Sequence, residues 1–216
     1  MSTLTKVALG VIGQLGPRPV KGDSKATIKL PAPDKRGGLP LMQALARRKS
    51  TREFERKPLP APVLSGLLWA AFGENRRGGG RTAPSAINVQ EIDVYVALPQ
   101  GAYLYDASGH TLRLVARRDV RRITGYQDFV DDAPLDLVYV ADHRRMKLVP
   151  AGSRESYSAI AAGTISQNVY LYAASEGLAT VVRAFIDRAA IARALDLGHD
   201  EHVLLSQTVG YPRRTH

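Results

Sequence analysis

Six consecutive residues near the start of the chain combine four cations with two hydroxyl groups: Arg47-Arg48-Lys49-Ser50-Thr51-Arg52. Guanidinium groups form paired hydrogen bonds with phosphate oxygens, and hydroxyl and backbone N–H groups complete sites of that kind. Basic residues at the end of a helix also complement the helix dipole without binding a ligand. The segment therefore indicates an anion site, and a purely structural basic turn is the alternative.

A second segment, from Arg81 to Gln90, places small, hydroxyl and amide side chains directly before an apolar run. Such residues let the backbone approach a ligand closely. The same composition is typical of an ordinary loop that enters a strand, and composition alone favours that interpretation. A third segment, Val181 to Phe185, follows a long helical pattern and has no chemistry of its own that indicates catalysis.

The elements that must position these segments follow from the spacing of apolar residues. We expect helices over residues 40–47, 61–72, 154–177 and 187–195, and strands over 92–98, 103–106, 111–115, 135–141 and 203–210, with a turn or short strand at 180–184. Gly177 is a suitable stop for the long helix. Helices and strands are mixed without a regular βαβ alternation, which predicts an α+β fold.

Residues 1–39 are rich in proline, glycine and lysine. This composition predicts an extended N-terminal arm that is either disordered or laid along a partner, followed by one folded domain over residues 40–216. The apolar stretch from Val7 to Ile12 is short for a signal peptide and lacks a clear cleavage site. We therefore expect a cytoplasmic protein without a membrane span, and an atypical export signal stays open as the alternative.

The chain of 216 residues contains 30 Lys and Arg, 20 Asp and Glu, and no cysteine. The lack of cysteine excludes disulfides, thiolate nucleophiles and cysteine-ligated zinc. The formal charge of +10 favours anionic partners, but no nucleic-acid-binding module is recognisable. His199 and His202 are three residues apart in an expected turn, which does not match paired metal ligands on a helix. We expect neither a metal nor a nucleic acid as partner.

Four motifs, in this order along the chain, resemble the FMN-dependent nitroreductase family. Arg48-Lys49-Ser50-Thr51-Arg52 resembles the R-x-S-x-R/K signature that opens these domains, and Pro84-Ser85-Ala86 with Asn88 resembles a P-S-x-x-N segment. The stretch Gly177–Phe185 resembles a G-L-G stretch that ends in Phe, and Gly210-Tyr211-Pro212-Arg213-Arg214 resembles the closing G-Y-P. Gly101-Ala102-Tyr103-Leu104-Tyr105-Asp106 is similar to the branch that includes SagB-type azoline oxidases.

This resemblance implies an FMN site and a role for each motif. Arg48 and Ser50, with Lys49 between them, would hold the phosphate and ribityl chain. Arg52 would approach the N1/O2 edge, where a fixed cation stabilises the negative charge of reduced flavin. The other implied contacts are Pro84, Ser85, Ala86 and Asn88 from the second subunit, Gln127 near the pyrimidine edge, the backbone of Arg183 and Ala184 at N5, and Arg213 at the phosphate.

The resemblance also implies an antiparallel sheet flanked by helices in an intertwined homodimer, with helix 154–177 at its centre and the 1–39 arm around the partner. The implied activity is ping-pong reduction of a nitroaromatic, quinone or similar small molecule by NAD(P)H. Two alternatives stay open. In one, flavin oxidises a small-molecule or peptide substrate; in the other, the chain is a basic interaction protein that has lost flavin. No catalytic acid or base is assigned. The chain departs from common family members at Glu91, Arg183 and Ala184, so no particular substrate carries over.

Overall fold

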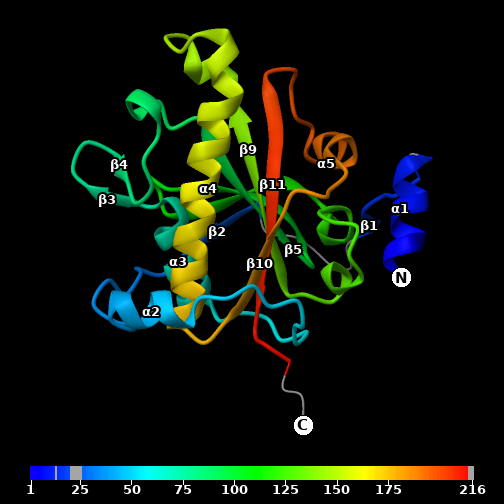
Figure 1. The fold of residues 1–216 in the computed structure, drawn as a ribbon, viewed down its shortest axis with the longest axis horizontal. Coiled ribbons are helices and arrows are strands. Elements are labelled where there is room, and N and C mark those ends of the chain that lie inside the picture. Colours follow the sequence, from blue (N-terminus) through cyan, green and yellow to red (C-terminus); the bar gives the residue numbers. More distant parts are fainter. Residues whose placement is uncertain (13, 20–25, 214–216) are drawn as a thin grey trace.

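The computed structural model describes residues 1–12, 14–19 and 26–213. Its centre is a seven-stranded sheet with the order β10-β11-β9-β5-β6-β7-β2, in which all neighbouring strands are antiparallel (Figure 1). The strands are β2 (Thr27–Lys29), β5 (Ile92–Leu98), β6 (Gly101–Asp106), β7 (Thr111–Ala116), β9 (Leu135–Asp142), β10 (Ala179–Arg183) and β11 (Glu201–Gly210). The predicted α+β class with an antiparallel sheet is confirmed.

Helices cover both faces of this sheet. Those described are α1 (Thr3–Val11), α2 (Leu41–Arg47), α3 (Ala61–Phe72), α4 (Ala151–Ser175) and α5 (Arg188–Leu195). Helices α3 and α4 pack against one core, and α5 packs against the core on the opposite face. Two short ribbons lie outside the main sheet: β1 (Arg18–Pro19) with β8 (Arg118–Asp119), and β3 (Glu74–Arg76) with β4 (Gly80–Arg81).

The two cores explain why the central strands have almost continuous apolar sequences. Side chains alternate between faces along a strand, and here both faces are covered. In β9, Leu137 and Tyr139 belong to the core under α3 and α4, whereas Val138 and Val140 belong to the core under α5. All eight residues of β9 are buried. The hydrophobic effect therefore fixes this strand in the middle of the molecule.

Local sequence signals determine most of the element ends. Helices α2 and α3 end at Arg47 and Phe72 as the sequence predicts. Gly177 adopts φ +68° directly beyond α4, a conformation that glycine adopts without strain. Asp187 caps α5 by accepting a hydrogen bond from the Ala190 N–H at 2.9 Å. These signals are local, so the sequence alone shows them.

The glycine-rich segment that follows α3 forms the hairpin β3–β4. Its glycines form the turn, and Trp69 Nε1 on α3 donates to the Glu74 carbonyl at 2.9 Å. The basic segment from Arg117 to Arg122 runs from strand β8 into a short 3-10 turn. Arg118 lies in β8, and Arg121 in the turn forms a nearly buried ion pair with Asp119 at 2.7 Å.

The expectation of an extended arm with little structure over residues 1–39 is wrong for residues 3–11 and 27–29, whereas residues 30–39 form neither helix nor strand. Residues 3–11 are helical, and β2 pairs with β7 at the edge of the main sheet. The side chain of Lys6 is fully buried against its own chain. Proline and glycine counts did not reveal these elements, because long-range contacts with β7 and with residues near 125–131 hold them. The domain boundary at residue 39 and the wrapping of a partner stay predictions.

Candidate functional site

The basic segment Arg48–Arg52 lies between α2 and the sheet edge formed by β10. Helix α2 ends at Arg47, and Arg48 turns out of the helix with ψ 121°. The Thr51 N–H donates to the Thr180 carbonyl on β10 at 3.0 Å. The chain is thus held beside an edge strand while the Lys49, Ser50 and Arg52 side chains remain exposed.

Tyr170 on α4 joins this segment to β10. Its hydroxyl accepts a hydrogen bond from the Val182 N–H at 3.0 Å and lies 2.8 Å from Ser50 Oγ. The Arg48 guanidinium lies 5.3 Å from the centre of the Tyr170 ring, a cation–π arrangement. Tyr170 belongs to none of the motifs singled out in the sequence. Its helical spacing gave no sign that its hydroxyl would meet Ser50.

A cavity of about 560 Å³ opens beside this segment. Lys49, Ser50 and Arg52 line one side of it. The small residues of the α4–β10 connection leave room for the cavity. The remaining lining residues are Arg47, Thr51, Glu53, Tyr170, Ala173, Ala174, Gly177, Leu178, Ala179, Thr180, Pro212 and Arg213. The volume falls within the range of pockets that hold small molecules and cofactors.

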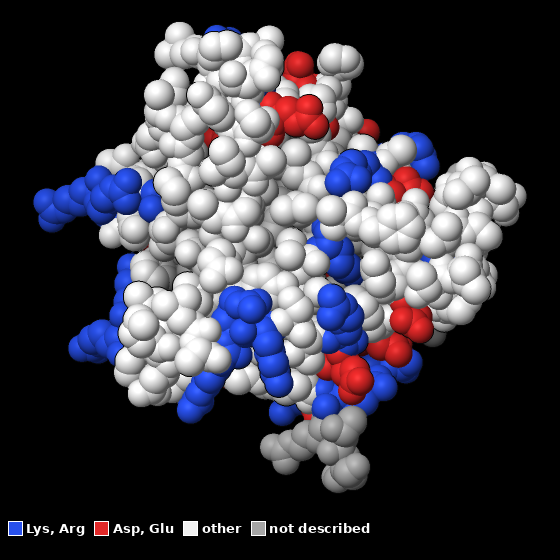
Figure 2. Space-filling view, in the orientation of Figure 1, with Lys and Arg blue, Asp and Glu red and all other residues white. Residues whose placement is uncertain are grey.

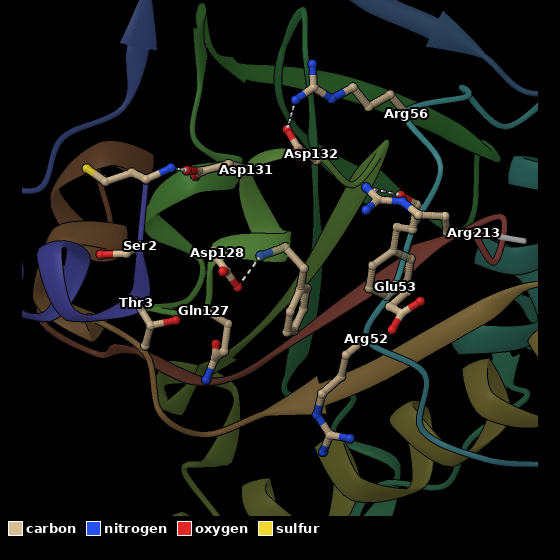
Figure 3. Close-up of a pocket in the computed structure, with 13 residues that line it drawn as sticks. Ser2, Thr3, Arg52, Glu53, Arg56, Gln127, Asp128, Asp131, Asp132 and Arg213 are labelled. Carbon is tan, nitrogen blue, oxygen red and sulfur yellow. Dashed lines mark hydrogen bonds and ion pairs between the residues drawn. The ribbon is translucent and has the colours of Figure 1, made fainter. Parts of the chain in front are cut away.

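A second cavity of about 980 Å³ adjoins the first, and Arg52, Glu53 and Arg213 line both. Figure 3 shows it between two walls. Ser2 and Thr3 from the N-terminal helix stand on one side with Gln127 nearby, and the chain carrying Arg52 stands on the other. Phe54 and Phe129, whose ring centroids lie 5.6 Å apart, add aromatic surface to its lining.

Within the described part of the chain, the cations at this site carry no carboxylate partner. Among the residues that the structure describes, Arg47, Arg48, Lys49 and Arg52 form no salt bridge, whereas Arg56, for example, pairs with Asp132 at 2.6 Å. Figure 2 shows blue Lys and Arg side chains gathered on the lower part of the face in view. The smaller cavity therefore offers positive charge to an anion, whereas the carboxylates of Asp128, Asp131 and Asp132 also line the larger one.

Arg183, an expected contact, lies inside the protein. Its guanidinium pairs with the fully buried Asp136 carboxylate at 2.7 Å, and Thr208 Oγ1 donates to the same carboxylate. Burial lowers the pKa of Arg183 and raises that of Asp136, and their mutual attraction opposes both shifts. The side chain of Arg183 is therefore structural. Ala184, one residue beyond β10, is exposed.

The segment from Pro84 to Asn88 does not line either cavity in this chain. It follows β4, which lies on the opposite side of α4 from β10 (Figure 1). Ile87 and Asn88 adopt φ values of +44° and +57°, and the Ile87 side chain is 67% exposed. A β-branched residue in the left-handed region is strained, so surrounding contacts must hold this turn. Ser85 Oγ supplies one by accepting from the Gln90 N–H at 3.0 Å.

One chain thus brings together part of the expected set. Lys49, Ser50, Arg52, Gln127 and Arg213 line the two adjoining cavities, and Arg48 stacks beside them. Pro84, Ser85, Ala86 and Asn88 lie elsewhere, the Arg183 side chain points inward, and Arg214 falls outside the described residues. The sequence missed Tyr170, Phe54, Phe129, Ser2 and Thr3, none of which belongs to a motif that was singled out.

In the part of the chain that the structure describes, no three His, Cys, Asp or Glu side chains gather in a way that would hold a metal ion. None of the helices there combines the length and apolarity that crossing a membrane requires.

Known proteins similar to this chain share its fold. The sequence profile of the nitroreductase family matches residues 45–211. A candidate nitroreductase of Methanocaldococcus jannaschii is 32% identical over 158 residues, which are 68% of this chain and 80% of that protein. The crystal structure of a candidate nitroreductase from Ralstonia eutropha JMP134 is 53% identical and covers 93% of this chain and 96% of its own, with a TM-score of 0.89. A Desulfovibrio desulfuricans structure, described as a candidate nitroreductase in complex with FMN, is 22% identical, covers 82% of this chain and 88% of its own, and has a TM-score of 0.60.

Proposed function

Because the chain belongs to the nitroreductase family, we propose that it is an FMN-dependent oxidoreductase that uses NAD(P)H to reduce a nitroaromatic, a quinone or a similar acceptor. The observation that carries the proposal is the pair of adjoining cavities that Arg52 and Arg213 share. One cavity has a basic rim and the other has aromatic and amide groups. The FMN complex of a relative with the same fold supports the choice of cofactor.

The donor groups at the smaller cavity fit the phosphate and ribityl chain of FMN. Arg47, Lys49 and Arg52 are cations without a carboxylate partner among the described residues, and Ser50 adds an exposed hydroxyl. Guanidinium and ammonium groups in this state bind phosphate without first breaking an ion pair. Arg48 and Arg213 would complete the phosphate contacts, and Arg52, which lines both cavities, would face the flavin ring.

The free edge of β10 fits the other expected contact. Along this edge the Thr180 carbonyl and the Val182 N–H already bond to Thr51 and Tyr170. Ala184 comes two residues later, where the strand has ended and the chain is exposed. Backbone groups of alternate residues point to the same side of a strand. We therefore assign the N–H that faces flavin N5 to Ala184, and we assign only a structural role to the Arg183 side chain.

When bound, FMN would take a hydride from NAD(P)H and pass two electrons to the acceptor, which takes up two protons if it is a quinone. Donor and acceptor would enter the larger cavity in turn, which is a ping-pong order. Arg52 would stabilise negative charge at the ring, because a fixed cation acts strongly where water is partly excluded. Gln127 and the Phe129 ring would orient a flat acceptor.

We also propose that the protein is a homodimer whose sites need both subunits. Pro84, Ser85, Ala86 and Asn88 cannot reach the cavities of their own chain, so a second copy would supply them. Large apolar side chains are exposed on α2 and α4 and in the turn after β4: Leu41, Met42, Leu45, Tyr157, Ile160 and Ile87. Exposed apolar groups in such number mark an interaction surface. A cytoplasmic location is part of the same proposal.

A place near the SagB-like branch stays a proposal that rests on the motif from Gly101 to Asp106. This motif forms all of strand β6 and continues into the hairpin with β7. Membership of this branch bears on the direction of the redox reaction, because members of the branch oxidise their substrates. For this chain, reduction of an acceptor is the preferred direction, and flavin-dependent oxidation of a small molecule or peptide is the alternative.

The first experiment is the visible absorption spectrum of the purified protein, followed by release and identification of the chromophore. Bound FMN near one per chain supports the proposal. A colourless protein that takes up no added FMN contradicts it and favours the basic interaction protein. Oxidation of NAD(P)H with a quinone, compared with O₂ uptake in the presence of a peptide or small-molecule donor, then separates the two directions.

The dimer has its own test. Ile160→Glu places a charge on the exposed face of α4, and we expect monomers by sedimentation together with weakened FMN binding. The matched control is Leu148→Glu, because Leu148 is also exposed but precedes α4. A monomeric Ile160→Glu variant that binds FMN normally would show that one subunit suffices for the site.

A further inference from the structure

Lys6 of α1 is fully buried, and its ammonium group is fully satisfied. Nζ lies 3.0 Å from Asp131 Oδ1 and donates to the carbonyl oxygens of Gly125 and Gln127, each at 3.0 Å. An ammonium group has three protons, and here each has an acceptor. These contacts connect the N-terminal helix to a segment more than 100 residues away in the sequence, the segment that carries Gln127.

The same helix forms one wall of the larger cavity. Ser2, which caps α1, and Thr3, its first residue, line this cavity opposite Arg52 (Figure 3). Lys6 is one turn further along α1, so its bonds fix the distance between this wall and Gln127. Ser2 and Thr3, which line the cavity, and Lys6, which fixes their position, therefore belong to one rigid element.

Helix α1 also packs closely on the segment that it positions. A Cβ atom placed on Gly10 would lie 2.5 Å from Cε1 of Tyr126, so the helix backbone and this ring are in direct contact. Two of the large apolar side chains of α1, Leu4 and Val11, are more than 80% exposed. Leu9 packs against the core under α5 and Lys6 is fully buried, so apolar packing and the polar contacts of Lys6 together hold the helix.

A buried ion pair of this kind adds little net stability to the folded state. Removing two charges from water costs several kcal/mol per ion, and apolar pairs of similar volume are often at least as stable. Consistent with this, burial lowers the pKa of Lys6, and Asp131 opposes the shift. What the pair provides is a unique geometry for the two carbonyl groups that flank Tyr126.

We propose that α1 is the wall of the larger cavity that selects the acceptor, and that Lys6 is a positioning residue. By bonding to the backbone carbonyl of Gln127, Lys6 holds the side-chain amide of Gln127 at this wall. The acceptor class is then a flat aromatic oxidant whose oxygens bond to Gln127 and to the hydroxyls of Ser2 and Thr3. The inference rests on the proposed function, because it takes the larger cavity to be the place where the acceptor binds.

The experiment compares the FMN-loaded wild-type protein with Lys6→Met and with Lys6→Met/Asp131→Asn. The single variant leaves Asp131 buried with the Met1 ammonium, 3.5 Å away, in place of its lysine, so we expect it to be destabilised. The double variant removes both charges and should recover most of the stability in urea denaturation. We expect the double variant to keep its FMN affinity within about twofold but to raise the KM for menadione about tenfold, the scale of effect that small misplacements produce.

A structural readout accompanies the kinetics. Hydrogen exchange at residues 125–127 should be faster in the double variant than in the wild-type protein, with or without FMN. Thr3→Ala, which truncates the wall, should raise the KM for menadione, and Leu4→Ala on the outer face of the same helix is its matched control.

The outcomes are separable. Unchanged KM and unchanged exchange in a stable, FMN-loaded double variant would overturn the inference and leave the proposed function intact. A wild-type protein that takes up no FMN contradicts the proposed function, and the role of α1 in acceptor selection is then rejected with it. Faster exchange at 125–127 with an unchanged KM also overturns the inference, because Lys6 would then stabilise the fold without serving the acceptor.

Discussion

Two regions of this molecule use the same residue types in opposite ways. In the interior, Arg183 pairs with Asp136 at 2.7 Å and Lys6 pairs with Asp131 at 3.0 Å, and all four side chains are nearly or completely buried. On the rim of the cavities, the cations of the Arg47–Arg52 segment are partly or fully exposed and form no salt bridge among the described residues. The buried cations are committed to partners within the chain, whereas those on the rim are available to a ligand.

Burial therefore distinguishes the cations that can bind a ligand from those that only stabilise the fold. A buried guanidinium needs a counter-charge, because an unpaired charge in a low-dielectric interior costs many kcal/mol. An exposed one is stabilised by water and can exchange that water for phosphate at little cost. Arg52 and Arg183 both belong to motifs that resemble FMN-binding segments, and the difference in their burial distinguishes their roles.

The largest expected effect is in the interior. Arg183→Met removes the cation while keeping an apolar side chain, and it leaves the Asp136 carboxylate buried without its partner. We expect the free energy of unfolding to fall by about 3–5 kcal/mol, measured by urea denaturation. Arg183→Met/Asp136→Asn should recover much of the loss. A single variant within about 1 kcal/mol of the wild-type protein would contradict the contrast between the two regions.

The next effect is on the rim. Arg48→Ala should weaken FMN binding by about 1.5–3 kcal/mol, the contribution of a hydrogen bond to a charged group, and change stability by less than about 0.5 kcal/mol. Fluorescence titration with FMN measures the affinity. Arg77→Ala is the matched control, because Arg77 is an exposed cation in the β3–β4 turn away from both cavities. Equal affinities for the two variants would remove Arg48 from the site.

His110 represents an intermediate case, a half-buried group that is neutral. Its Nε2 lies 2.7 Å from Ser65 Oγ, and its Nδ1 lies 2.9 Å from the Tyr105 hydroxyl. Ser65 already donates its proton to the Pro31 carbonyl at 2.6 Å, so Nε2 must donate to Ser65 and Nδ1 must accept from Tyr105. Burial lowers the pKa of His110 and keeps the ring in this neutral form.

This arrangement predicts a pH dependence of stability. The unfolded chain takes up a proton near the ordinary pKa of 6.5, whereas folded His110 resists it until its lowered pKa is reached. The contribution of His110 to the free energy of unfolding is complete above pH 6.5. It is lost as the pH falls from 6.5 through the lowered pKa of the folded state, with a slope of at most about 1.4 kcal/mol per pH unit.

Urea denaturation between about pH 7 and about pH 5 measures this slope. The control His110→Asn has no titrating ring and tolerates the local φ of +48°. Parallel pH profiles for the two proteins would contradict the prediction.

The smallest effect should come from an exposed ion pair. Arg56 and Asp132 lie 2.6 Å apart, and the Arg56 side chain is 77% exposed. Arg56→Ala should change the free energy of unfolding by less than about 1 kcal/mol, because water and salt screen such pairs. If this variant loses as much stability as Arg183→Met, then burial is not what separates the two kinds of cation.

Local patterns were sufficient for most of the fold. The apolar faces of α3 and α4, the β-branched runs of β5 and β9, and the turn between β6 and β7 depend on neighbours in the sequence, and all were predicted close to their observed bounds. Helix α1 and strand β2 were missed. Lys6 bonds to residues near 125–131 and β2 pairs with β7, so neither element has a purely local cause.

The site was predictable only to the level of its motifs. Lys49, Ser50, Arg52, Gln127 and Arg213 were named from the sequence and line the cavities. Tyr170 and the wall formed by α1 were not, because spacing along one helix does not show which distant hydroxyl or backbone group a side chain will meet.

The α+β class, most of the elements and the family follow from the sequence alone, because periodicity and ordered motifs are properties of the chain. Which cations are free and which are paired depends on how distant segments pack. The tertiary structure turned Arg183 inward to Asp136, left Arg52 at the junction of two cavities, and placed the N-terminal helix against Gln127. The physical reason is that the energy of a charge depends on its burial and its partners, and both arise only when distant segments pack together.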